Sequence, residues 1–205
     1  LGGVYSVGHN GAGKSSIFRC LGGLWDIPCG TIRKPGGVAN DKGASNDAMF
    51  YIPQKPYQVV GTLIDQMTYP KFDVADELSE DRMREILAEV DLEYLLEREG
   101  ALTDDIIWEN ELSLSEKQRL AIARLIFNKP RFAILDECSS AITAHMEQNL
   151  YRICVQSDIT YVTIAHRPAL QAFHDKILAI GDGKCGFSIK TLDNAKVKEH
   201  VKLMA

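Results

Sequence analysis

The sequence lacks long hydrophobic runs, paired cysteines and an excess of positive charge. Its apolar stretches are as short as Phe132–Leu135, whereas a membrane-spanning helix needs roughly 20 apolar residues, so we expect no span in this chain. The 23 Lys and Arg residues are outnumbered by 28 Asp and Glu residues, which gives a net charge of −5. Because a surface that binds a phosphate backbone is positively charged, we do not expect a nucleic acid partner.

Cysteine use excludes two further classes of protein. The cysteines are odd in number and none forms a Cys-x-x-Cys pair, so neither a disulfide framework nor a zinc site is expected, and reduced thiols in a cytosolic setting are the default. They are Cys20, Cys29, Cys138, Cys154 and Cys185. The chain begins at Leu1 with none of the features of a signal peptide, and it looks cut from a longer protein.

What is present is an alternation of strand and helix patterns. The 205 residues are 45% hydrophobic, enough for one sizeable core or two small lobes. Predicted strands cover Val4–Val7, Thr31–Arg33, Ala48–Ile52, Phe132–Leu135, Ile159–Ile164 and Lys176–Ile180. Predicted helices follow Gly13, with Ile17, Phe18 and Leu21 on one side, and cover Leu78–Leu96, Glu116–Asn128 and Ala141–Cys154. This alternation predicts an α/β fold with a parallel sheet covered on both faces.

The region Leu78–Leu96 is the most regular helical pattern. Met83, Ile86, Leu87 and Val90 recur at the spacing of one helix face, with charged residues between them. We interpret those charges as the solvated face of an amphipathic helix rather than as a binding surface.

A glycine-rich segment carries the strongest chemical signal. Gly8–Ser15 fits the pattern G-x-x-x-x-G-K-[ST] without mismatch, between a predicted strand and a predicted helix. Such a loop turns backbone N–H groups toward phosphate oxygens, Lys14 reaches the β and γ phosphates, and Ser15 offers its hydroxyl to Mg²⁺. The alternative, a glycine-rich turn that carries Lys-Ser by chance, is disfavoured by the flanking strand and helix. The predicted phosphate-binding residues are Gly8, His9, Asn10, Gly11, Ala12, Gly13, Lys14, Ser15 and Ser16.

Two acids follow a buried strand further along the chain. Asp136 and Glu137 end the apolar run Phe132–Leu135, the layout of a second Mg²⁺ strand in P-loop nucleotidases. Asp136 is the candidate metal-binding carboxylate, and Glu137 is the candidate base that polarises an attacking water. On its own this pattern is more often a strand that enters a polar loop, so the prediction depends on the phosphate loop upstream.

Four further segments resemble motifs of the nucleotide-binding domain of ABC transporters, in the order that the family has them. They are Tyr51–Tyr57 for the Q-loop, Leu112–Arg119 for the signature, Ser139–Ala141 for the D-loop and Ile164–Pro168 for the H-loop. The resemblance implies that Gln54 reaches the Mg²⁺ and the attacking water, and that His166 contacts the γ phosphate. It also implies that Ser113 and Ser115 of the signature face the ATP of a partner domain.

Several stretches are similar to subfamily D, the peroxisomal half-transporters. They are Phe18–Trp25, Gly61–Gln66, Arg98–Gly100, Leu135–Cys138 and His166–Pro168. The resemblance implies an ABC-type ATPase with a RecA-like P-loop core. It implies ATP and Mg²⁺ as ligands, and a second nucleotide-binding domain and a transmembrane domain as partners. It further implies transport of fatty acyl-CoA from the cytosolic face of the peroxisomal membrane, with lysosomal and bacterial relatives as alternatives.

The resemblance also implies that residues 1–205 are one ATP-binding domain without its first strands and its membrane domain, and we expect a helical subdomain at about 57–115 inserted in it. The chain departs from the family where Leu114 and Ser115 replace the two glycines of the signature. Because glycine lets a backbone approach a phosphate closely, these changes predict a weakened contact in trans. Two other functions therefore stay open: a degenerate or non-transporting P-loop ATPase that binds ATP with little turnover and, less favoured, a P-loop kinase.

Overall fold

The structure is a computed structural model that describes residues 2–27, 29–34, 37–38, 49–181 and 186–193. The contacts between residues divide the chain into two units. The first unit comprises Leu1–Pro53, Pro130–Glu137 and Gln148–Ala205, and the second comprises Gln54–Lys129 and Cys138–Glu147.

The first unit is built on a mostly parallel sheet. Among the described residues its strands lie in the order β10-β9-β1-β8-β7-β4, and only the pairing of β10 with β9 is antiparallel. The strands are β1 (Gly3–Val7), β4 (Met49–Ile52), β7 (Phe132–Asp136), β8 (Thr160–Ile164), β9 (Lys176–Ile180) and β10 (Phe187–Thr191). The predicted parallel α/β sheet is confirmed, while β10 is a strand that the sequence patterns did not predict.

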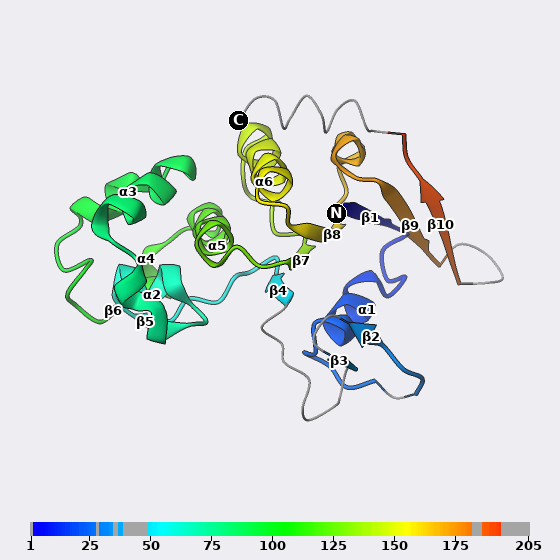
Figure 1. The fold of residues 1–205 in the computed structure, drawn as a ribbon, viewed down its shortest axis with the longest axis horizontal. Helices are drawn as coiled ribbons and strands as arrows, with labels where there is room; N and C mark the ends of the chain where they lie inside the picture. The colour runs from blue at the N-terminus through cyan, green and yellow to red at the C-terminus, as the bar shows by residue number, and fades with distance from the viewer. Residues whose placement is uncertain (1, 28, 35–36, 39–48, 182–185, 194–205) are drawn as a thin grey trace. The chain divides into compact units, whose positions relative to one another are not determined.

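Helices cover both faces of this sheet. Figure 1 shows α1 (Lys14–Leu21) on one face and α6 (Ala144–Gln156) on the other. On the α1 side, Phe18 packs with Ile134, Ile164 and Ile180 in a buried apolar cluster. Ile17 is 44% exposed, so the prediction that it lies on the same side of the helix as Phe18 is wrong. Successive helical residues lie about 100° apart, so a short helix whose face is centred on Phe18 turns Ile17 outward.

Two shorter pieces complete the first unit. A 3₁₀ helix, η3 (Pro168–Phe173), links β8 to β9, and β2 (Arg33–Lys34) pairs with β3 (Gly37–Val38) as a hairpin. The predicted strand Thr31–Arg33 thus overlaps β2 only at Arg33. Ala48, the first residue of the strand predicted before Pro53, lies outside the described residues.

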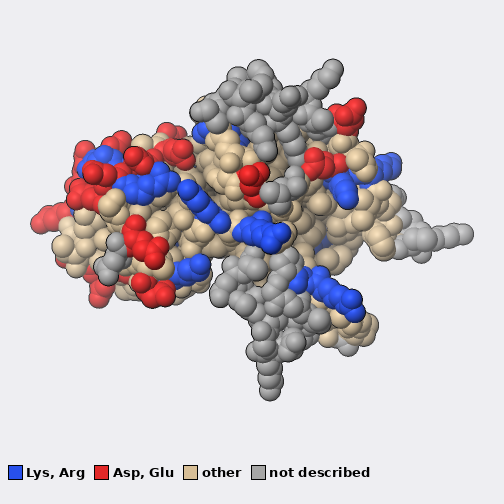
Figure 2. Space-filling model, viewed as in Figure 1, with Lys and Arg blue, Asp and Glu red and all other residues tan. Residues whose placement is uncertain are grey.

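The second unit is mainly helical. Its elements are β5 (Val60–Gly61), α2 (Leu63–Thr68), η1 (Phe72–Glu77), α3 (Glu80–Glu89), η2 (Glu93–Glu97), β6 (Ile106–Ile107), α4 (Trp108–Glu111) and α5 (Leu114–Asn128). The apolar face predicted from Met83 to Val90 is confirmed, since its four residues are at most 1% exposed. Arg82 and Arg84 pair with glutamates on the outer face, and Figure 2 shows both signs of charge interspersed where α3 lies. The pattern continues only as a 3₁₀ turn after Asp91, whose φ of 55° interrupts the helix.

Two helix starts differ from prediction for reasons of capping. Ser113 and Glu116 form a reciprocal capping box, so α5 begins at Leu114, two residues before the predicted start. The Thr143 hydroxyl accepts a hydrogen bond from the Met146 N–H, and α6 begins at Ala144 rather than at Ala141. No helix among the residues that the structure describes has the length and apolarity of a membrane span.

Candidate nucleotide-binding site

The first unit gathers three loops at one edge of its sheet. The strands β1, β8 and β7 are neighbours, and the register pairs Ser6 with Ile164 and Ile164 with Asp136. Because parallel strands end at the same edge, the loops after these three strands converge there. They carry the glycine-rich segment, the H-loop with His166, and Glu137.

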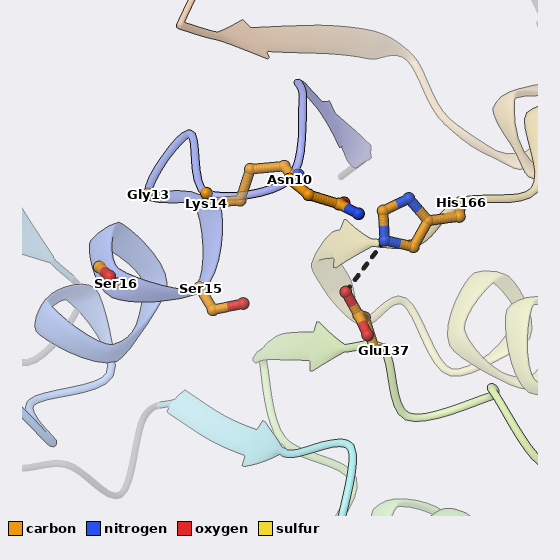
Figure 3. Close-up of a pocket in the computed structure, with 8 residues that line it drawn as sticks. Asn10, Gly13, Lys14, Ser15, Ser16, Glu137 and His166 are labelled. Carbon is orange, nitrogen blue, oxygen red and sulfur yellow. Dashed lines mark hydrogen bonds and ion pairs between the residues drawn. The ribbon is translucent and has the colours of Figure 1, made fainter.

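These loops line a pocket with a volume of about 430 Å³ (Figure 3). Its lining residues are Asn10, Gly11, Gly13, Lys14, Ser15, Ser16, Glu137 and His166. Every one of them was a predicted site residue, and they come from three separate regions of the sequence. The structure therefore brings the predicted phosphate loop together with the predicted base and the predicted histidine.

The glycine-rich loop ends in a helix N-terminus that is open to a ligand. Gly13 precedes α1 with a φ of 88°, a left-handed conformation that favours glycine, and no side chain caps the helix. The first turn of α1 contains no acidic residue, so the positive end of the helix dipole is not neutralised locally. This arrangement leaves backbone N–H groups and partial positive charge for an anion at the pocket.

Lys14 is held beneath the loop by backbone carbonyl groups. Its ammonium donates to the carbonyl oxygens of Gly8 at 2.8 Å and His9 at 3.1 Å, and the residue is only 7% exposed. Gly8 cannot carry a side chain here, since a Cβ would lie 2.4 Å from the Ile180 carbonyl oxygen. The predicted residues Gly8 and His9 thus act through their backbone, by placing the cation. The Ala12 N–H donates to the His9 carbonyl at 3.1 Å and closes the turn.

Asp136 is a buried carboxylate with a partner on each oxygen. Ser15 Oγ donates to one oxygen at 3.0 Å, and the Tyr51 hydroxyl donates to the other at 2.6 Å. Burial, together with the hydrogen bond and the charge of Asp136, raises the pKa of Tyr51, so the phenol stays protonated as a donor. Sequence reasoning gave Tyr51 no role, because its contact depends on the pairing of β4 with β7.

Glu137 and His166 face each other across the pocket. Their Oε1 and Nε2 atoms lie 3.1 Å apart (Figure 3), and the Glu137 N–H donates to the Ile164 carbonyl at 2.9 Å. Glu137 has a φ of 50°, a conformation that is uncommon outside glycine. Such a backbone persists where surrounding bonds hold it, and it aims the carboxylate at the pocket rather than along the strand.

The remaining predicted site residues belong to the second unit. Gln54 is exposed and its carbonyl accepts from the buried Gln118 amide at 2.8 Å. Gln118 also bonds Ser140 Oγ at 3.0 Å and accepts from the Ala141 N–H at 2.9 Å. One side chain on α5 therefore joins the Q-loop to the D-loop, a role that the sequence pattern did not reveal.

The signature residues lie at the start of α5. Ser113 donates its hydroxyl to Glu116, which also accepts from Tyr94. Burial works to raise the pKa of Glu116, but the hydrogen bonds from Ser113 and Tyr94 outweigh it and hold that pKa below the usual 4.5. Burial and the same carboxylate raise the pKa of Tyr94 to about 12. Leu114 is 39% exposed at the first helical position, next to Ser115.

Comparison with known proteins decides the family. Residues 4–140 match the family described as ABC transporter. The chain belongs to the ABC transporter family. The fold class and the family that the sequence motifs implied are therefore confirmed, and the P-loop kinase interpretation is wrong.

The relatives of this ABC transporter chain include members of subfamily D. It is 50% identical over 185 residues to ABC transporter D family member 1 of Arabidopsis thaliana, covering 89% of this chain and 13% of that protein. It is 40% identical over 198 residues to human ATP-binding cassette sub-family D member 3, which covers 95% of this chain and 28% of that protein. The chain thus spans less than a third of the length of either relative.

A solved ABC exporter shares the fold. The structure of a bacterial Atm1-family ABC exporter with ATP bound matches with a TM-score of 0.75 and 27% sequence identity. The match covers 97% of this chain and 35% of the exporter chain.

Proposed function

We propose that this chain is the ATP-binding and ATP-hydrolysing domain of an ABC half-transporter. The observation that carries the proposal is the pocket at which Lys14, Glu137 and His166 converge, with the last two 3.1 Å apart. A nucleotide triphosphate needs a cation and N–H donors at its phosphates and a base beside the γ phosphate. The pocket offers each of these from a different loop.

Binding of ATP is the first step. The N–H groups at the start of α1 surround the β phosphate, and the Lys14 ammonium, already aimed by the carbonyls of Gly8 and His9, compensates the β and γ charges. The predicted contacts from Asn10 and Ser16 complete the phosphate site, since both residues line the pocket.

The residues present fit a magnesium ion. Asp136 is a buried carboxylate within 3.0 Å of the Ser15 hydroxyl, and hard oxygen donors of this kind are what Mg²⁺ prefers. Asp136 and Ser15 would hold the ion, with Gln54 as a further proposed ligand. When bound, Mg²⁺ neutralises charge on the β and γ phosphates.

Hydrolysis then depends on Glu137 and His166. The Glu137 carboxylate orients a water molecule and takes its proton as the water oxygen bonds to the γ phosphorus. The bond between that phosphorus and the β–γ bridging oxygen breaks, which yields ADP and inorganic phosphate. His166 contacts the γ phosphate and, through its bond to Glu137, keeps the carboxylate in place.

We infer that the site is completed by a second copy or a homologous domain. Ser113 and Ser115 of one domain would face the γ phosphate bound by the other, and the helical subdomain at about 57–115 would present them. ATP binding then closes the pair, hydrolysis opens it, and a transmembrane domain on the same or an associated chain converts the motion into transport.

The transported substrate is proposed from the relatives. The relatives' names place them in the subfamily that the sequence motifs resemble. That resemblance supports a half-transporter on the cytosolic face of the peroxisomal membrane, with long-chain fatty acyl-CoA as the substrate. Uptake of labelled fatty acyl-CoA into vesicles that contain the full-length protein tests this point. ATP-dependent uptake supports it, and ATP hydrolysis that fatty acyl-CoA neither accompanies nor stimulates contradicts it.

The decisive experiment for the ATPase is Glu137→Gln in the full-length protein. ATP binding should be kept while hydrolysis falls by about 10² to 10⁴-fold, the usual effect of losing a positioned base. Glu97→Gln, the same change at an exposed carboxylate of η2, is the matched control and should leave the rate unchanged. If the Glu137 variant turns over ATP at the parent rate, the assignment of the base is wrong. If the parent binds ATP without hydrolysing it, the degenerate cassette is the better description.

A further inference from the structure

A buried tyrosine lies directly behind the loop that carries His166. Tyr5 is on β1, is 2% exposed, and its register partner on β8 is Thr163. Its side chain extends beyond the end of β8, and its hydroxyl meets the backbone carbonyls of Ala165 at 2.8 Å and Arg167 at 3.0 Å. These two residues are the immediate neighbours of His166 in the sequence.

The hydroxyl restrains the backbone before and after the histidine, because its one proton is shared between the carbonyl of the Ala165–His166 peptide and that of the Arg167–Pro168 peptide. The His166 side chain is itself 57% exposed, so packing around the ring does little to set its direction. Its position over the pocket therefore depends on the backbone that carries it. A hydroxyl shared between the flanking carbonyls restrains that backbone where a phenylalanine at position 5 would not.

The surroundings of Tyr5 hold the same segment at two further points. The rings of Tyr5 and the fully buried His174 meet edge to face, with centroids 5.2 Å apart. His174 Nδ1 donates to the Leu170 carbonyl at 2.7 Å, because a carbonyl only accepts, and Nε2 lies 2.9 Å from the Thr163 hydroxyl. The chain is thus tied down shortly before and shortly after His166.

We propose that Tyr5 is a positioning residue for ATP hydrolysis, whose hydroxyl holds the His166 loop in the orientation that lets the imidazole contact Glu137 and the γ phosphate. The proposal rests on the role proposed above for His166. It predicts a defect in turnover rather than in ATP binding, since the hydrogen bonds described for the Lys14 ammonium go to the carbonyls of Gly8 and His9.

The test is Tyr5→Phe in the full-length protein, with kcat, KM for ATP and the thermal midpoint measured together. The variant keeps the ring against His174 and loses only the hydroxyl. We expect kcat to fall about five- to tenfold, with KM unchanged within about twofold.

Tyr161→Phe is the matched control. Tyr161 is 1% exposed, contacts the same His174 ring and donates its hydroxyl to the carbonyl of Phe173, which is not a sequence neighbour of His166. It should lower the thermal midpoint about as much as Tyr5→Phe does, but leave kcat unchanged. An unchanged kcat for Tyr5→Phe, or an equal fall in both variants, overturns the proposal.

A double-mutant comparison shows whether Tyr5 acts through the histidine. His166→Ala alone should lower kcat strongly, and adding Tyr5→Phe to it should have no further effect. A further fall in the double variant overturns the Tyr5 proposal while leaving the role of His166 intact. If His166→Ala retains the parent rate, the role proposed for His166 itself is wrong.

Discussion

The two units of the chain both have aliphatic cores, but they differ in the polar groups that they bury. In the first unit the parallel strands bury aliphatic side chains, and Ile134 and Ile164 are each 1% exposed, while the buried polar residues include Asp136 at 4% and His174 at 0% exposed. The second unit buries an arginine and two glutamines in its core: Arg124 is 3% exposed, and Gln66 and Gln118 are fully buried. Apolar packing is non-directional, whereas buried polar groups must find partners at fixed angles.

Arg124 shows what the polar interior of the second unit does. Its guanidinium donates to the carbonyl oxygens of Tyr57 and Gln66 and to the side-chain oxygens of Gln58 and Gln66. Burial lowers its pKa to about 10, a sign of how strongly the site disfavours the charge. The segment between β4 and α2 is therefore shaped by directional bonds to one side chain, and we expect the second unit to be less tolerant of single polar substitutions than the sheet is of aliphatic ones.

The largest effect is expected for Arg124→Met. The substitution keeps much of the volume but leaves several buried oxygens without donors, so the second unit should lose about 3 to 5 kcal/mol of stability. Ile134→Val in the first unit should cost only about 1 kcal/mol. Proteolysis in increasing urea, followed at cleavage sites in each unit, measures both losses. Equal losses in the two variants would remove the distinction between the units.

The next effect concerns the exposed end of α5. Replacing Leu114 and Ser115 by glycine should raise ATP hydrolysis of the paired protein by up to about 10²-fold, because a backbone donor acts on a phosphate only at close range. ATP affinity of the isolated domain should stay nearly constant, since the contact is made in trans. Steady-state ATPase assays on the reconstituted protein decide the matter. Equal rates for parent and variant would mean that the loop tolerates both side chains.

Lys14→Ala should weaken ATP binding by about 1.5 to 3 kcal/mol, the usual contribution of a charge-assisted contact. Titration calorimetry measures the change. Lys190→Ala, at a lysine on β10, removes the same charge elsewhere in the first unit and should leave binding unchanged. Since Lys14 bonds only to its own loop among the contacts described, the second unit should keep its resistance to urea. A Lys14 variant that binds ATP like the parent would refute the phosphate-loop assignment.

The smallest effect is a pH dependence at the start of α5. The pKa of Glu116 is lowered in the folded protein, so its contribution to stability is present above its ordinary value of 4.5 and is lost as the pH falls through the lower folded value. Glu116→Gln removes this titration and should flatten the stability curve of the second unit below pH 4.5. Glu85→Gln, at an exposed ion pair on α3, serves as the comparison. If the stability of the parent and of Glu116→Gln changes with pH in the same way below pH 4.5, the pKa of Glu116 is not lowered in the folded protein.

Local patterns predicted much of the first unit and its site. Short continuous segments of sequence encode the P-loop, the acids after β7 and the apolar face of α3. The start of α5 at Leu114 could also have been predicted from the sequence, because Ser113 and Glu116 have the spacing of a capping box. The sequence alone could not have predicted β10, whose Phe187 and Ile189 are exposed and whose strand state depends on pairing with β9. Local patterns could not predict the contacts of Tyr5, Tyr51 and Gln118 either, since each contact joins segments at least 22 residues apart.

The backbone of Glu137 has a consequence for how this chain tolerates sequence change. At a φ of 50° the position suits glycine or asparagine better than a branched or long side chain, so a glycine there would relieve about 1 kcal/mol of conformational cost. The substitution that makes folding easier is thus the one that removes the proposed base. At this residue, selection for a stable domain therefore opposes selection for turnover. A chain with glycine at position 137 would still fold and bind nucleotide, but it would not hydrolyse ATP.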